Sequence, residues 1–75
     1  DPVYAYAWHD RGSAQRQLNN LPAAIQDYTQ ALKLQPDLLP ALLNRAATRR
    51  RAGDLKGALQ DYTDYLTKKQ DNALA

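Results

Sequence analysis

Cysteine is absent from this chain of 75 residues, and methionine, phenylalanine and glutamate are absent with it. The lack of cysteine excludes disulfide bonds, thiolate metal sites and thiol nucleophiles, although it leaves the redox compartment open. One histidine and a scatter of aspartates provide no plausible metal-ligand set, so we expect no metal and no cofactor. No apolar run approaches the roughly 20 residues of a membrane-spanning helix. We therefore expect a soluble chain without membrane insertion, and take the cytoplasm as its default location.

Two stretches of the chain repeat each other at a fixed offset. Residues 23–32 (AAIQDYTQAL) return as residues 57–66 (GALQDYTDYL), a shift of 34 positions. Such a period marks a solenoid, whose units bury their apolar faces by stacking on one another. We divide the chain, as a single domain over 1–75, into one repeat at about 5–38 and another at about 39–72. The missing initial methionine indicates a piece of a longer protein, and the function is expected to lie in a surface.

The few glycines and prolines fall where four helices would begin or end. The expected helices run over about 3–18, from Pro22 to before Pro36, from Asp37 to about 52, and from Asp54 to Lys68 and Lys69. Asp1, Asp37 and Asp54 are expected as N-caps, because a side-chain oxygen there accepts hydrogen bonds from the free amides of the first turn. Asn19 and Asn20 form the first turn.

Apolar stripes at three- and four-residue spacing follow the second and fourth helices and face a core. They comprise Ala24, Ile25, Tyr28, Ala31 and Leu32 in one repeat, and Ala58, Leu59, Tyr62, Tyr65 and Leu66 in the other. The sequence therefore predicts an all-α chain that contains a helix-turn-helix twice.

The order of small and large residues resembles a known family. Trp8, Gly12, Ala24, Tyr28, Ala31 and Pro36 match the signature of a tetratricopeptide repeat, and Leu42, Ala46, Ala58 and Tyr62 match it again in the second unit. The resemblance implies two antiparallel helix-turn-helix units stacked as a short right-handed α-α superhelix. It also implies a non-enzymatic scaffold that holds a peptide or helix of a partner protein in a groove. Tyr65 and Gln70 stand at the places of Ala31 and Pro36, which indicates that the second repeat ends the array or lacks a following helix.

The resemblance places this groove on the first and third helices, opposite the face of Trp8, Gly12 and Ala46. The residues that follow the groove-facing pattern are Tyr6, His9, Asp10, Ser13, Arg16 and Gln17, and Pro40, Leu43, Asn44, Ala47, Arg50 and Arg51. Residues 1–38 carry a charge of −1 and the remainder +3. A basic strip at the groove, suited to an acidic peptide, is predicted from Arg16, Arg45, Arg49, Arg50 and Arg51, of which Arg16 and Arg50 recur at one repeat position. Relatives that grip a terminal carboxylate use an asparagine at the place of Asn44, but His9 and Ser13 here replace the lysine and asparagine of that clamp.

Other functions stay open beside peptide binding. Short arrays leave their end helices uncovered, and self-association would use apolar surface from among Leu38, Leu39, Leu42, Leu43, Leu66 and Leu74. RNA binding is a weaker alternative, because the net charge is only +2 and no basic stretch is interleaved with exposed aromatics. Catalysis by His9, Asp10 and Ser13 is not expected, since one exposed helix supplies neither a group that orients the base nor donors for an oxyanion.

Two arginine–aspartate pairs recur at the same separation, Arg11 with Asp27 and Arg45 with Asp61. We predict that each forms a partly buried ion pair that joins the two helices of its repeat and fixes their register. Arg49 has a simpler interpretation, as a hydrated cation that complements the dipole at a helix C-terminus.

Overall fold

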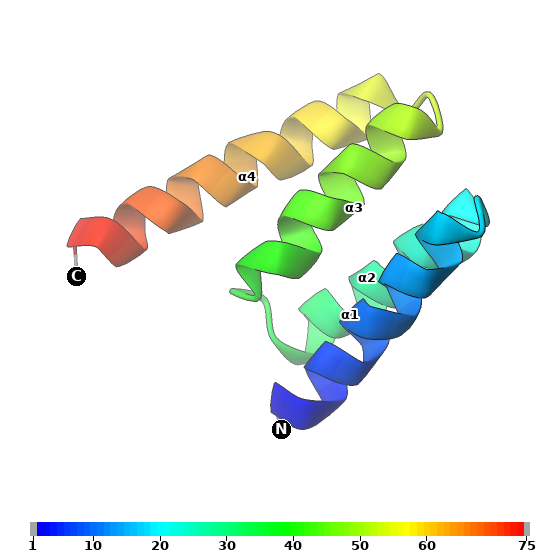
Figure 1. Cartoon of the computed structure of the whole chain (residues 1–75). Helices are drawn as coiled ribbons and strands as arrows, with labels where there is room; N and C mark the ends of the chain where they lie inside the picture. The colour runs from blue at the N-terminus through cyan, green and yellow to red at the C-terminus, as the bar shows by residue number, and fades with distance from the viewer. Residues whose placement is uncertain (1, 75) are drawn as a thin grey trace.

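The computed structural model describes the backbone of residues 2–74 and the side chains of residues 3–71. Within that range the chain forms four helices: α1 (Pro2–Gln17), α2 (Leu21–Leu34), α3 (Leu39–Arg51) and α4 (Leu55–Leu74). The described part of the chain contains no strand, which confirms the all-α prediction. Figure 1 shows α1 beside α2 and α3 beside α4, each pair running antiparallel across a tight turn. The two hairpins meet where α3 packs on α2, and α1 touches α3 over a shorter stretch.

The turns that close the two hairpins are built alike. Asn19 has a φ of 65° and Gly53 a φ of 94°, and these residues occupy equivalent positions of the two repeats. The backbone N–H of Asn20 donates to the backbone carbonyl of Gln15 at 2.8 Å, and the backbone N–H of Asp54 donates to the backbone carbonyl of Arg49 at 2.8 Å. Both are six-to-one hydrogen bonds of a Schellman motif. This motif requires one residue in the left-handed backbone conformation, which glycine and asparagine adopt most readily. The predicted turns at these two places are confirmed.

Of the predicted aspartate N-caps, the one at Asp54 is confirmed and the one at Asp37 is wrong. Asp54 caps α4 as predicted, because its Oδ1 accepts the amide of Gly57 at 3.0 Å. Asp37 does not cap α3: the N-cap is Leu38, without a side-chain hydrogen bond. Leu38 is 2% exposed, and burial of its side chain stabilises the structure by more than the roughly 1 kcal/mol of a cap. The predicted cap at Asp1 lies outside the described residues.

Helix α4 is longer than predicted, since it continues past Lys68 and Lys69 to Leu74. Cations near a C-terminus complement the helix dipole, but they do not terminate a helix. No glycine or proline follows Gly57, so the chain there lacks the residues that end a helix.

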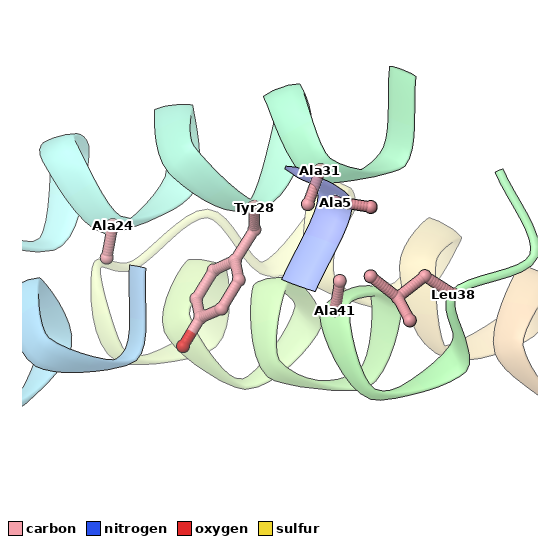
Figure 2. Close-up of a cluster of buried hydrophobic side chains, with 6 residues drawn as sticks. All are labelled: Ala5, Ala24, Tyr28, Ala31, Leu38 and Ala41. Atoms are coloured by element: carbon pink, nitrogen blue, oxygen red, sulfur yellow. The ribbon is translucent and has the colours of Figure 1, made fainter. Parts of the chain in front are cut away.

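Small residues let the helices approach closely around one tyrosine. The core cluster comprises Ala5, Ala24, Tyr28, Ala31, Leu38 and Ala41 (Figure 2). Trp8 and Leu32 are partly buried against it. A Cβ on Gly12 would lie 3.0 Å from two ring carbons of Tyr28, so a side chain at position 12 would force the ring to move. Figure 2 shows the core alanines coming from α1, α2 and α3, which is how a single core joins the two hairpins.

The apolar stripe predicted for the fourth helix is only partly buried. Ala58 is 3% exposed, but Leu59 and Leu66 are 67% and 60% exposed. Their equivalents in the first repeat, Ile25 and Leu32, are half-buried because α3 packs on α2. Among the described helices α4 packs against α3 alone, so the prediction that Leu59 and Leu66 face a core was wrong.

Candidate functional site

The predicted groove residues of the two repeats meet through a hydrogen-bonded histidine. The side-chain Nδ2 of Asn44 on α3 lies 3.0 Å from Nε2 of His9 on α1. On the other side of the ring, Nδ1 of His9 lies 3.2 Å from Oδ1 of Asp10. A neutral imidazole that carries its proton on Nδ1 satisfies both contacts, since Nε2 then accepts from Asn44 and Nδ1 donates to the carboxylate. His9 thus ties the first hairpin to the second.

Aromatic rings hold His9 in this position. The ring of Tyr6 meets it edge-on at a centroid distance of 6.4 Å, and the core residue Tyr28 lies on another side at 5.6 Å. The His9 side chain is only 15% exposed. It therefore serves as a fixed contact between helices, with Tyr6, which is 48% exposed, as the aromatic surface beside it.

Ser13 turns toward the core. Its hydroxyl and the hydroxyl of Tyr28 are hydrogen bonded at 2.9 Å, and Ser13 is half-buried. Ser13 therefore pairs with the core tyrosine and not with His9. On the facing helix Ala47 is half-buried, and the neighbouring Thr48 is fully buried with its hydroxyl bonded to the carbonyl of Asn44 at 2.7 Å. A threonine that bonds its own helix backbone can be buried, so polarity alone gave no signal for Thr48.

Among the remaining groove residues, Pro40 and Leu43 are exposed and apolar, and the other four are polar. Arg50, Arg51 and Gln17 are exposed, and Arg16 is half-buried. Over residues 3–71, Arg16, Arg50 and Arg51 take part in no ion pair with the chain's own aspartates. We define the α1–α3 face as the surface formed by Tyr6, His9, Ser13, Arg16, Gln17, Asn44, Ala47, Arg50 and Arg51.

The second predicted ion pair is the centre of a larger network. Arg45 donates through Nε and Nη2 to the two carboxylate oxygens of Asp61, each at 2.9 Å. Its third nitrogen, Nη1, donates to the hydroxyl of Thr29 on α2 at 3.2 Å. Arg49 also donates to Asp61 at 2.9 Å and approaches Asp54 at 3.7 Å. Arg49 is therefore not merely a hydrated cation, and Arg45 connects α2, α3 and α4.

The equivalent pair in the first repeat is weaker. Nε of Arg11 lies 3.3 Å from Oδ2 of Asp27, a charge contact without hydrogen-bond geometry, and that buried oxygen has no hydrogen-bond partner. The Arg11 side chain is 64% exposed, whereas that of Arg45 is 16% exposed. The guanidinium of Arg11 also lies 5.6 Å from the ring centre of Trp8. The predicted register pair is thus strong in one repeat and loose in the other.

Two surface hollows lie away from the α1–α3 face. One of about 430 Å³ is lined by Trp8, Arg11 and residues of α2 including Asp27 and Lys33. Another of about 190 Å³ is lined by Tyr4, Ala7, Trp8 and Arg11. None of the predicted groove residues lines either hollow.

Stacked helical hairpins with a shared core define a helical repeat chain. The family model of the tetratricopeptide repeat matches residues 5–38, the span predicted for the first repeat. The match is consistent with a tetratricopeptide repeat over residues 5–38, and the four helices fit two such repeats. No curated protein matches the chain.

The family defines the general role. Tetratricopeptide repeats are protein–protein interaction modules and are typically non-enzymatic scaffolds. In the part of the chain that the structure describes, no group of three or more histidine or acidic side chains is arranged to hold a metal ion. None of the helices within residues 2–74 is both long enough and apolar enough to cross a bilayer.

Proposed function

We propose that the chain binds an acidic peptide or helix of a partner protein along its α1–α3 face. The observation that carries the proposal is the hydrogen bond between Asn44 and His9, which fixes the two helices beside each other next to arginines without ion-pair partners. A guanidinium that lacks an internal partner is free to form forked hydrogen bonds with a carboxylate of the ligand.

The remaining chemistry of the face supports an extended ligand. Tyr6 offers an exposed ring for an apolar side chain, while Arg16, Arg50 and Arg51 would align acidic side chains. His9 and Asn44 bond each other, so neither is arranged as the centre of a carboxylate clamp. The proposed partner is therefore an acidic segment recognised along its length, with no requirement for a free C-terminus.

Fluorescence anisotropy with a labelled peptide that alternates glutamate and leucine tests this proposal, and a glutamine–leucine peptide serves as its neutral counterpart. We expect the acidic peptide to bind and the neutral one to bind at least tenfold more weakly. The variant R16Q/R50Q removes two cations from the face, and K33Q/K56Q removes two exposed cations elsewhere.

At roughly 0.7 kcal/mol for each exposed arginine–carboxylate contact, R16Q/R50Q should weaken binding by about tenfold. The control K33Q/K56Q, which has the same net charge, should change it by less than about threefold. Equal losses in the two variants would show general charge attraction without a site, and would refute the proposal. The same conclusion would follow if neither peptide bound.

A further inference from the structure

The interface between α2 and α3 shows how one repeat of this chain receives the next. On α3, the residues Leu38, Ala41 and Leu42 are 2%, 0% and 3% exposed, and Arg45 completes the contact by bonding Thr29 of α2. On α2, Ile25, Thr29 and Leu32 are half-buried. Repeat packing of this kind is a nearest-neighbour interaction that is renewed at each step of an array.

The first helix carries the equivalent of the α3 side of this interface without a cover. Tyr4, Ala7, Trp8 and Arg11 correspond to Leu38, Ala41, Leu42 and Arg45 at the repeat offset. Tyr4 is 65% exposed, the Arg11 side chain 64%, and Ala7 is exposed as well. These four residues, which we call the α1 end face, line the hollow of about 190 Å³.

The last helix carries the equivalent of the α2 side. Leu59, Thr63 and Leu66 correspond to Ile25, Thr29 and Leu32, and we call them the α4 end face. Leu59 and Leu66 are 67% and 60% exposed, and Thr63 is exposed. The threonine that accepts from Arg45 inside the chain is thus present again on the open face of α4.

The weak Arg11–Asp27 ion pair of the first repeat is expected if no neighbouring helix covers the α1 end face. In the second repeat α2 covers Arg45 and Thr29 engages its third nitrogen, and the guanidinium then grips both oxygens of Asp61. Arg11 has no such neighbour, and Oδ2 of Asp27 stays buried without a hydrogen-bond donor. Covering Arg11 would lower the local dielectric and strengthen its pairing with Asp27.

We propose that the chain binds a second copy of itself head to tail, with the α4 end face of one copy covering the α1 end face of the next. In this complex Arg11 of one copy donates to Thr63 of the other, as Arg45 donates to Thr29 within the chain. The two faces are different surfaces of one molecule, so the contact is heterologous and continues into a chain of copies. Helix α2 ends at Leu34, whose equivalent in the second repeat is Lys68, whereas α4 continues for six residues to Leu74. In the proposed complex these six residues extend beyond the contact.

Sedimentation equilibrium from about 10 µM to about 1 mM is the first test. We expect the average mass to rise with concentration and to pass the mass of two chains. A mass that stays at one chain throughout this range would overturn the proposal, and would leave a further repeat joined in the same polypeptide as the occupant of these faces.

Two end-blocked variants test the orientation. A7R places a cation on the α1 end face and L66R places one on the α4 end face, while L18R is a control at a 72% exposed leucine in the α1–α2 turn. A7R alone and L66R alone should each remain single chains, because the contact needs one α1 end face and one α4 end face, and each variant keeps only one of the two. Their mixture should form one-to-one pairs that do not extend, and L18R should associate like the unchanged chain.

Far-UV circular dichroism establishes that each variant keeps its helices. If A7R alone still formed pairs, the contact would be α4 against α4, and if L66R alone did so it would be α1 against α1; either result would overturn the head-to-tail arrangement. A mixture that stays monomeric would overturn it too. T63V removes the proposed acceptor hydroxyl and should weaken association about threefold, whereas T67V, outside the face, should leave it unchanged.

Discussion

Replacing Asp61 by asparagine should destabilise the fold far more than replacing Asp27, although the two aspartates occupy the same place in successive repeats. Asp61 has a side chain 2% exposed and accepts hydrogen bonds from Arg45 and Arg49, all at 2.9 Å. Asparagine has nearly the same shape, but it offers one acceptor oxygen and points an NH₂ group at a guanidinium. D61N therefore leaves the largely buried Arg45 without an anion, and leaves Arg49 with only its 3.7 Å contact to Asp54.

The sizes of the two effects follow from the exposure of the arginines. Removing one partner of a buried ion pair costs about 3–5 kcal/mol. Arg45 and Arg49 are 16% and 24% exposed and regain some water, so we expect the lower end, about 3 kcal/mol. Arg11 is 64% exposed and already hydrated, and loss of its contact in D27N should cost about 0.5 kcal/mol.

Urea denaturation followed by far-UV circular dichroism measures both free energies of unfolding. A domain of this size has a stability of about 4–11 kcal/mol, so D61N should stay measurable while losing a large share of it. Equal losses for D61N and D27N, within about 0.5 kcal/mol, would refute the reasoning that coverage by α2 makes the second pair strong. The cycle of R45M, D61L and the double variant should give a coupling of about 2 kcal/mol.

Further predictions concern the close packing at Gly12, the turn at Gly53 and the hydroxyl pair of Ser13 and Tyr28. The variant G12A should lower the free energy of unfolding by about 1–2 kcal/mol, because its Cβ would press on the fully buried ring of Tyr28. The variant G53A should lower it by about 1 kcal/mol through the backbone φ of 94° alone, since no atom lies within 4 Å of the new Cβ. Urea titration of both variants measures the sign and size of each effect. S13A and Y28F each break the 2.9 Å hydroxyl pair and should each cost about 1 kcal/mol, and a double variant that costs the full sum of the two would contradict the pairing.

The helical hairpins could be predicted from the sequence because their signals are local. The 34-residue offset gave the repeat, and the left-handed positions at Asn19 and Gly53 follow from residues that favour that conformation. The start of α3 could not be found in this way, because burial of Leu38 decides it against the local preference of Asp37 for a cap. The end of α4 was missed since dipole complementarity was taken for a stop signal.

The candidate site was harder to predict than the fold. The groove pattern of the tetratricopeptide repeat, applied at the repeat spacing, placed Asn44 and His9 on one face, and their side chains are in contact. The same spacing treated the Arg11–Asp27 and Arg45–Asp61 pairs as equal, whereas their strength depends on whether a neighbouring helix covers the arginine. Coverage is a tertiary property, and the matching spacing of the two pairs gives no sign of it.

The guanidinium of Arg45 touches three helices, and this has a consequence for how the protein melts. Loss of the second hairpin breaks the hydrogen bonds of Arg45 to Asp61 and to Thr29, and loss of the first breaks the bond to Thr29 and leaves the guanidinium uncovered. Part of the stability of each hairpin therefore comes from contact with its neighbour, which is the nearest-neighbour term of a repeat array. The backbone amides buried in α2 and in α4 should then exchange their hydrogens with deuterium through one common opening, as a single cooperative unit.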